Sequence, residues 1–279
     1  MVSDAKRPGI HVNDPDLAAT LEVRYLRRLL ASLPAGCRTA IDAGAHRGAI
    51  SAALAEIGLS TLAIEPNPPI ADQLEANLAR EICAGFVKLV RCAASDREGF
   101  ADLILGTATT VSTLEHSWAS VGFPELFRKP ISVRVPVRRL DWVAAAHGYG
   151  TGGRLGLLKV DVEGHELSAL RGFFDAGRVP APSVVMFEAF ERFPEQAAGC
   201  LAYLAEQGYA TFDIVVRHGA DLLEIERFHA PRLPRSWRQD VLFYANVIAY
   251  HPSVAAADLP DPVAFTADVA RRTRNPEAA

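Results

Sequence analysis

The sequence predicts one doubly wound α/β domain, in which a mostly parallel sheet carries helices on both faces. Through the middle of the chain, short apolar runs suited to buried strands alternate with amphipathic stretches suited to helices. This alternation is typical of right-handed βαβ crossovers. The chain has 279 residues, of which 49% are hydrophobic, and this is enough for one sizeable buried core.

The first part of the chain predicts a polar tail followed by a single helix. Residues 1–15 are polar, and from Asp16, a suitable N-cap, to Ser32 the apolar residues recur on one helical face. We therefore expect residues 1–36 to form a tail and a packing helix, ahead of a main domain at 37–251.

Five apolar runs predict strands of the parallel sheet, and five amphipathic stretches predict its helices. The strands fall at 38–44, 60–66, 86–94, 155–162 and 183–190, and the helices at 49–57, 69–82, 139–147, 165–176 and 194–207. Two further runs, 209–215 and 241–250, have no clear helix between them. We therefore expect an antiparallel pairing at the end of the sheet.

Two segments depart from this alternation of strands and helices. Residues 96–138 are longer than a simple connection and carry many serines and threonines. They predict an insertion with a hairpin and a loop, of a kind that often carries function. Residues 252–279 are rich in alanine, proline and charge, and predict a C-terminal tail ending in a helix.

Composition excludes several classes of protein. Lys and Arg number 29 against 33 Asp and Glu, and this mild acidity disfavours a protein that grips nucleic acid through its phosphates. The sequence shows neither a secretory signal nor an apolar run long enough to cross a membrane. The cysteines form no C-x-x-C pair and are expected as reduced thiols: Cys37, Cys83, Cys92 and Cys200. We expect a cytoplasmic protein.

A glycine turn follows the first predicted strand of the sheet. Gly44 permits a tight turn after Asp42, and Gly48 lets the next helix approach closely. The turn differs from the dinucleotide fingerprint G-x-G-x-x-G, because His46 stands where the second glycine would be. A pyrophosphate would be crowded there, which favours S-adenosylmethionine over NAD; the alternative is a purely structural turn.

Acidic residues end two other strands. Glu65 ends the second strand, and an acidic group there can accept both ribose hydroxyls of an adenosine-containing cofactor; alone, it would be read as a helix cap. Asp161 and Glu163 emerge on the same side of a later strand end. Charges at the end of so apolar a strand are costly unless they are used, although Glu166 fits a simple acidic helix start.

Taken together, these motifs resemble the FkbM-type S-adenosylmethionine-dependent methyltransferases. The resemblance covers residues 38–250 and rests on five stretches: DAGAHRG, AIEPNP, RRLDWVAAAHG, LLKVDVEGHELSALRG and VVMFEAF. It implies a class I (Rossmann-like) methyltransferase fold, with a seven-stranded sheet whose last strand is antiparallel. It also implies S-adenosyl-L-methionine as cofactor and O-methylation of hydroxyls on sugars, glycolipids, polyketides or related natural products.

Carried over by position, the resemblance implies three parts of a cofactor site. The methionine side falls on Asp42, Gly44, Ala45, His46 and Gly48, with Asp161 a candidate for the cofactor's ammonium group. The ribose falls to Glu65, with Pro66 and Asn67 beside it. The adenine falls near Ala93, Ala94, Ser95 and Asp96, where the aspartate comes later than in many related methyltransferases.

A hydroxyl acceptor needs a general base within hydrogen-bond reach. Asp161 and Glu188 are the leading pair for base and orienter, and His165 is an alternative whose first-turn position predicts exposure to solvent. Glu163 is expected on the acceptor side of the crevice. His116 and Trp118, in the insertion, are further acceptor-binding candidates; the alternatives are a solvated histidine and a local aromatic core.

The expected partner is a small-molecule or glycan acceptor rather than nucleic acid, and a homodimer is a family-level expectation. No metal is expected, although Asp161, Glu163 and Glu188 could assemble an oxygen site for Mg²⁺. Three alternatives remain: an N-methyltransferase on the same fold, a non-catalytic module that binds an adenosine ligand, and a dehydrogenase. The missing second glycine disfavours the dehydrogenase.

Overall fold

The computed structural model describes most of the chain. Its described residues are 10–11, 15–34, 36–107, 111–128, 130–150, 153–190, 192–218, 222–229, 244–255 and 259–274. Most of the expected N-terminal tail, residues 1–9 and 12–14, lies outside them. Among the described helices, none is long and apolar enough to cross a membrane.

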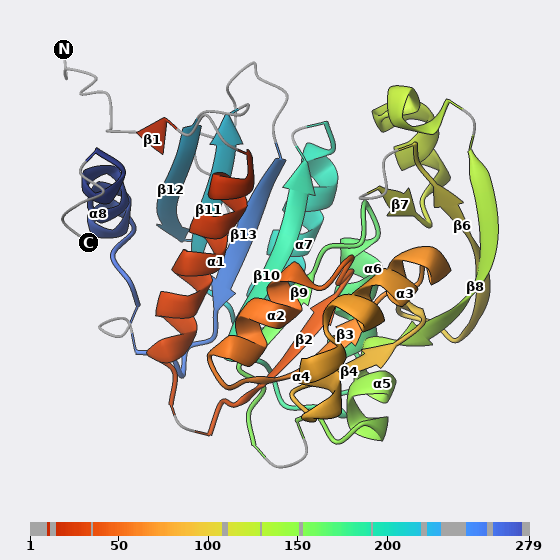
Figure 1. Cartoon of the computed structure of the whole chain (residues 1–279), viewed down its shortest axis with the longest axis horizontal. Coiled ribbons are helices and arrows are strands. Elements are labelled where there is room, and N and C mark those ends of the chain that lie inside the picture. Colours follow the sequence, from red (N-terminus) through yellow and green to blue (C-terminus); the bar gives the residue numbers. More distant parts are fainter. Residues whose placement is uncertain are drawn as a thin grey trace.

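A twisted sheet of nine described strands forms the centre of the molecule (Figure 1). Its spatial order is β1 (Ile10–His11), β12 (Leu222–His229), β11 (Thr211–His218), β13 (Tyr244–Tyr250), β10 (Val184–Phe190), β9 (Leu157–Val160), β2 (Thr39–Ala43), β3 (Ser60–Ile64) and β4 (Val87–Val90).

The five strands from β10 to β4 are parallel, and β13 runs antiparallel to both of its neighbours. The expected antiparallel strand is therefore confirmed. The expected number of seven strands is too low, because β12 and β1 extend the edge beyond β11. The strand β12 was not predicted from the sequence, because its residues alternate between apolar and charged and form no continuous apolar run.

Helices cover both faces of the sheet. In Figure 1, α1 (Pro15–Ala31) and α2 (Ala49–Glu56) lie in front of it, with α3 (Pro68–Asn77) and α4 (Ala79–Cys83) beside β3 and β4. On the opposite face lie α5 (Leu140–Ala146), α6 (Glu166–Phe174) and α7 (Pro194–Glu206). The first helix begins at Pro15, one residue before its predicted cap.

The two faces have separate cores because side chains alternate along each strand. Ala40 and Leu157 pack towards α1, whereas their neighbours Ile41 and Leu158 pack towards α5, α6 and α7. All four side chains are fully buried. The sheet is therefore held rigidly from both sides, and the strand ends that carry the polar motifs are fixed in place.

The insertion forms a second, smaller sheet, at the right of Figure 1. Its order is β5 (Ala93–Ser95), β8 (Ile131–Arg139), β6 (Gly99–Leu105) and β7 (Ser112–Thr113). The expected hairpin is formed by the consecutive strands β6 and β7, and β6 also pairs antiparallel with β8. Two short helical turns, Trp118–Gly122 and Pro124–Phe127, follow β7.

The strand expected at 86–94 is two strands in two different sheets. Arg91 divides the run, because its guanidinium pairs on the surface with Asp72 and Glu75. After it, β5 turns away from the main sheet and pairs with the end of β8. An apolar run interrupted by a single exposed arginine therefore concealed a change of sheet.

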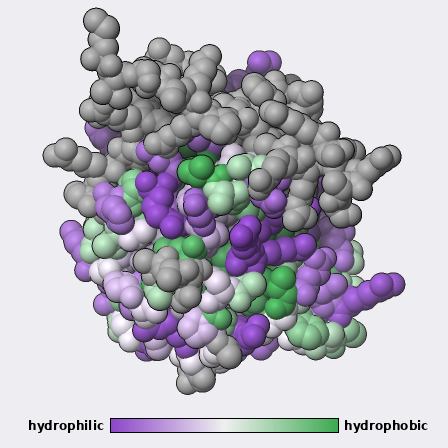
Figure 2. All heavy atoms as spheres, turned by 90° about the vertical axis from the view of Figure 1, so that its left-hand side faces the viewer, coloured by the Kyte–Doolittle hydropathy of each residue, from purple (hydrophilic) through white to green (hydrophobic). Residues whose placement is uncertain are grey.

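A buried ion cluster ties the far edge of the sheet together. The fully buried Asp213 accepts hydrogen bonds from the hydroxyls of Tyr25 and Tyr250, both at 2.5 Å, and from Arg227 at 2.7 and 2.9 Å. These residues come from α1, β13 and β12. At this end α8 (Pro262–Arg274) packs on β12, and Figure 2 shows a described surface with hydrophilic residues interspersed among hydrophobic ones.

Candidate functional site

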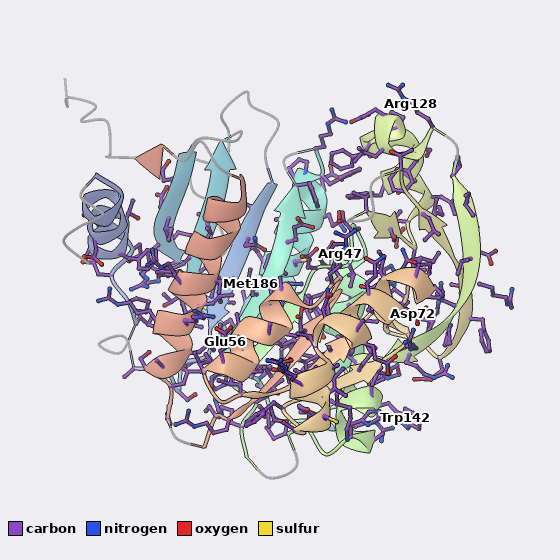
Figure 3. All side chains as sticks on the ribbon, viewed as in Figure 1. Arg47, Glu56, Asp72, Arg128, Trp142 and Met186 are labelled. Carbon is purple, nitrogen blue, oxygen red and sulfur yellow. The ribbon has the colours of Figure 1, made fainter. Side chains whose placement is uncertain are left out.

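A cavity of about 880 Å³ opens at the carboxyl ends of β2, β3, β9 and β10. This is the edge at which open α/β sheets bind their ligands. Glu56 and Met186, labelled in Figure 3, mark the part beside α1 and α2. The insertion closes the opposite part, so the cavity lies between the N-terminal helices and the second sheet.

Gly44 fixes the floor of the cavity. Its φ is +78°, and a Cβ there would lie 1.7 Å from the carbonyl oxygen of Asp161. No side chain fits between β2 and β9 at this point. Gly48 has a different role from the one expected: a Cβ on it would meet Leu78 at 2.6 Å. It lets α2 pack on the helices beside it and is not among the described residues that line the cavity.

Lys159 lies at the centre of the floor and was missed as a functional residue. Its ammonium contacts Asp42 Oδ1 at 3.1 Å, Asp161 Oδ2 at 3.2 Å and the carbonyl of Gly44 at 3.1 Å. Burial lowers its pKa, but Asp161 and Asp42 more than offset this and raise the pKa above the ordinary lysine value. The signal that could have identified Lys159 in the sequence is its place inside the apolar run LGLLKVDV.

Asp42 lies behind the cavity rather than in its lining. It is fully buried, pairs with Lys159 and accepts a hydrogen bond from Ser51 at 2.7 Å. In the sheet, Asp42 and Lys159 are direct partners in register. Asp42 was expected on the methionine side of the cofactor site, but the structure pairs it with the ammonium of Lys159, and Asp161 is the aspartate that lines the cavity.

Glu65 holds two loops with its carboxylate. Oε2 accepts the backbone N–H of His46 and Oε1 that of Asn67, both at 2.9 Å. Burial raises the pKa of Glu65 to about 6, although these two hydrogen bonds lower it. Each oxygen keeps a free lone pair, and Glu65 lines the cavity together with His46 and Pro66.

Three carboxylates meet where β9 and β10 end. One oxygen each of Asp161, Glu163 and Glu188 lies within 4.8 Å of the others, and all three residues line the cavity. Burial, followed by the charge of Asp161, raises the pKa of both Glu163 and Glu188. Oε2 of Glu188 is buried without a hydrogen-bond partner among the described residues.

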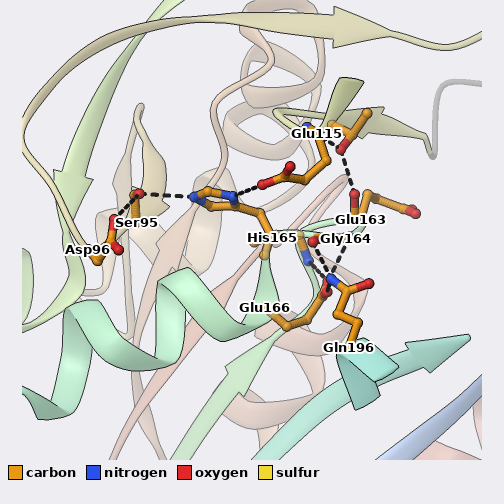
Figure 4. Close-up of polar contacts among 10 residues, drawn as sticks. Ser95, Asp96, Glu115, Glu163, Gly164, His165, Glu166 and Gln196 are labelled. Atoms are coloured by element: carbon orange, nitrogen blue, oxygen red, sulfur yellow. Dashed lines mark hydrogen bonds and ion pairs between the residues drawn. The ribbon is translucent and has the colours of Figure 1, made fainter. Parts of the chain in front are cut away.

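His165 is buried in a polar chain rather than exposed, contrary to expectation (Figure 4). Its Nε2 lies 2.9 Å from Ser95 Oγ, and its Nδ1 lies 2.6 Å from Glu115 Oε1. The hydrogen bond from His165 lowers the pKa of Glu115. Ser95 in turn contacts Asp96 at 3.2 Å, and neither of them is among the described lining residues, which here are Ala93 and Ala94.

The insertion supplies an aromatic wall. Trp118 is 2% exposed, lines the cavity and lies 4.6 Å from the ring centroid of Phe123 and 5.4 Å from that of Phe190. His116 is exposed and is not among the described lining residues, so its expected contact with the acceptor is not supported. Glu115, one residue before it, is the residue that reaches the site.

Buried polar atoms without partners show where a ligand fits. Among the described residues these include Asn67 Oδ1, Trp118 Nε1 and Glu188 Oε2. Buried polar groups in native proteins are almost always hydrogen-bonded. Trp118 and Glu188 line the cavity, whereas Asn67 is not among its described lining residues. The first two therefore mark polar positions where a bound molecule would find hydrogen-bond partners.

This sheet order, with a glycine turn after β2 and an acidic residue after β3, defines the class I S-adenosylmethionine-dependent methyltransferases. The model of the methyltransferase FkbM domain matches residues 42–211, which is more than half of the chain. The chain therefore belongs to the FkbM methyltransferase family. It is a methyltransferase, and S-adenosyl-L-methionine is its cofactor.

Comparison with solved structures gave only distant similarities. The precorrin-6y C5,15-methyltransferase from Geobacter metallireducens is 12% identical over 85% of this chain and 88% of its own, with a TM-score of 0.40. A putative RNA methyltransferase from Pyrococcus horikoshii is 12% identical over 85% and 83%, with a TM-score of 0.45. TM-scores of this size do not decide the acceptor. A search of curated protein sequences gave no match.

Proposed function

We propose that the protein transfers the methyl group of S-adenosylmethionine to a hydroxyl oxygen of a small molecule, sugar or natural product. The observation that carries this proposal is the buried, unpartnered Oε2 of Glu188 beside Asp161 and Glu163. A hydroxyl attacks well only if its proton is removed as the bond forms, and that requires a base placed in the cavity. The cluster of carboxylates also repels the phosphates of nucleic acid.

The chain's own residues fit the cofactor. We assign the ribose to Glu65, whose oxygens keep free lone pairs, and a neighbouring polar group of the adenosine to Asn67 Oδ1. We assign the methionine part to the floor of the cavity at Gly44, where Asp161 faces it with a carboxylate. When bound, S-adenosylmethionine supplies an electrophilic methyl group.

Glu188 is the proposed general base. Burial, followed by the charge of Asp161, raises the pKa of Glu188 above the ordinary glutamate value, and a stronger base takes the proton of a hydroxyl more readily. Asp161, held by Lys159, is the proposed orienter: its negative charge keeps the pKa of Glu188 high. The proton of the acceptor hydroxyl would pass to Glu188 Oε2 while the acceptor oxygen bonds to the methyl carbon, the bond from that carbon to the sulfur breaks, and S-adenosylhomocysteine leaves.

His165 is assigned a positioning role rather than proton transfer. Both of its ring nitrogens are engaged, one by Ser95 and the other by Glu115 (Figure 4). A proton from an acceptor hydroxyl would have to displace one of these partners. The same two contacts fasten the insertion to the start of α6, so His165 holds the acceptor wall in place.

The proposal is tested by supplying S-adenosylmethionine with a labelled methyl group. The acceptors are pools of hydroxylated small molecules and glycans, matched amines in which a hydroxyl is replaced, and transcribed RNA. We expect label in a methyl ether, identified by mass spectrometry. Label only in N-methyl products or in RNA would contradict the proposed acceptor class, although the chain would still be a methyltransferase.

Removal of metal ions with EDTA is expected to leave methyl transfer unchanged. Lys159 already places a fixed cation beside Asp161, and the positively charged cofactor enters the same cavity. Together they compensate the carboxylates without a divalent ion. Initial rates before and after chelation, with Mg²⁺ added back, measure this. A loss of rate that Mg²⁺ restores would instead assign Asp161, Glu163 and Glu188 to a cation site.

A further inference from the structure

We propose that the acceptor is an uncharged, largely apolar molecule with a hydroxyl or carbonyl oxygen, and that the indole N–H of Trp118 donates a hydrogen bond to that oxygen. Trp118 would then determine acceptor specificity. The inference rests on the proposed function, because it concerns the acceptor side of the same cavity. It goes further by naming the chemical class of the acceptor and the group that recognises it.

The acceptor side of the cavity is an apolar wall. It is built by the insertion and by the end of β10, through Val111, Leu114, Trp118, Phe123, Leu126 and Phe190. The rings of Phe123 and Phe190 lie 5.3 Å apart with an edge-on geometry. A wall of this kind gains binding free energy by covering apolar surface, which a free sugar offers only sparingly.

The charges near this wall disfavour an anionic acceptor. The carboxylates of Asp161, Glu163 and Glu188 lie at the bottom of the wall. The ammonium of Lys159 is already shared between Asp161 and Asp42. A phosphate or carboxylate on the acceptor would meet these carboxylates across a mostly apolar space, where repulsion is strong. An uncharged acceptor avoids this cost.

The indole nitrogen of Trp118 selects for an oxygen. Nε1 is buried and has no partner among the described residues, whereas buried tryptophan N–H groups usually find one. The five-membered ring of the indole packs on Gly164: a Cβ there would lie 2.5 Å from Cδ1 and 3.1 Å from Nε1 of Trp118. Because an indole N–H can only donate, its partner must be an acceptor atom. An ammonium group cannot serve.

The segment that leads to Trp118 is anchored by two contacts. Thr113, five residues before it, donates to the carbonyl of Glu163 at 2.6 Å, and Glu115, three residues before it, contacts His165 at 2.6 Å (Figure 4). The indole N–H is therefore held beside Glu163, the member of the carboxylate cluster that precedes Gly164 in the chain. A preorganised donor of this kind confers specificity without further rearrangement.

The test compares two probes of equal shape, 2-naphthol and 2-methylnaphthalene, which differ only in the oxygen. Their affinities are measured by calorimetry on the full-length protein saturated with S-adenosylhomocysteine. The variant Trp118→Phe keeps an aromatic ring and removes the N–H. Trp142→Phe, at a residue that is 52% exposed, is the matched control. The cationic probe 2-(aminomethyl)naphthalene and the anionic probe 2-naphthyl phosphate complete the set.

We expect Trp118→Phe to weaken binding of 2-naphthol about tenfold, the effect of one buried hydrogen bond, and to change binding of 2-methylnaphthalene by less than about twofold. Trp142→Phe should change neither. Equal effects on both probes would overturn the role of the N–H. Absent binding of 2-naphthol, or tighter binding of either charged probe, would overturn the acceptor class.

The affinity for S-adenosylhomocysteine alone separates this inference from the proposed function. If the native protein binds S-adenosylhomocysteine but shows no dependence on the probe's oxygen, the inference fails and the methyltransferase site stands. If it does not bind S-adenosylhomocysteine, the proposed function fails first. Unchanged cofactor affinity and unchanged urea unfolding in Trp118→Phe show that the variant is folded, so that a weakened 2-naphthol complex reports on the N–H.

Discussion

Replacing Glu188 with glutamine is expected to lower kcat about 10²- to 10⁴-fold, the usual contribution of a general base. Glutamine keeps the size of the side chain but cannot take the proton of a hydroxyl acceptor. Affinity for S-adenosylmethionine should stay near that of the native protein, because we assign Glu188 to the acceptor rather than to the cofactor. Single-turnover rates and calorimetry measure the two quantities separately.

The dependence of the methyl-transfer rate on pH tests the same assignment. The base must be deprotonated, so the native rate should fall as pH decreases through the pKa of Glu188, which burial and Asp161 raise above the ordinary glutamate value. The variant should lose that acidic limb. Glu206→Gln removes the same charge at an exposed position on α7 and is the control. A Glu188→Gln protein with native kcat would contradict the assignment.

Replacing Lys159 with methionine is expected to lower the free energy of unfolding by about 3–5 kcal/mol, the cost of leaving a buried charge without its partner. Methionine fills similar space, but Asp42 then stays fully buried, and among the described residues its remaining hydrogen-bond partner is the hydroxyl of Ser51. This is a large share of the total stability of a domain, which is about 5–15 kcal/mol. Urea unfolding followed by circular dichroism measures it.

The double variant Lys159→Met with Asp42→Asn tests the cause. Removing both charges should recover most of the lost stability, since the fully buried ion is gone and Asp161, which also loses its contact with Lys159, has a side chain that is 31% exposed to solvent. Lys88→Met, at an exposed position on β4, should change the free energy of unfolding little. If the double variant is as unstable as the single one, the loss comes from packing around Lys159 rather than from Asp42.

The order of elements was predictable because each strand and helix carries a local pattern. The apolar runs that became β2, β3, β9 and β10 are bounded by glycine or by polar strand ends, and the helices between them show clear periodicity. Two points failed for physical reasons. Arg91 concealed a change of sheet, and β12 lies next to the short edge strand, where its charged residues are half-buried among apolar ones.

The candidate site was predictable where its residues stand at the ends of predicted strands. Gly44, Glu65, Asp161 and Glu163 stand at strand ends, and the carboxyl ends of parallel strands meet at one edge. The partners of these residues depend on contacts across the fold. No local pattern predicts that Lys159 lies opposite Asp42 in register, or that Glu115 crosses from the insertion to His165.

The most direct test of the central claim is a calorimetric titration with S-adenosylmethionine of the native protein, Glu65→Gln and the surface control Glu75→Gln. We predict micromolar binding to the native protein and the control, and binding about tenfold weaker or more to Glu65→Gln, which loses a charged acceptor.

Lowering the pH from about 7.5 to about 5 should weaken native binding about tenfold, because Glu65 becomes protonated below its pKa of about 6. The Glu65→Gln variant should lack this dependence. Undiminished binding in Glu65→Gln would contradict the assignment of the cofactor to this cavity, and absent binding in the native protein would contradict the account as a whole.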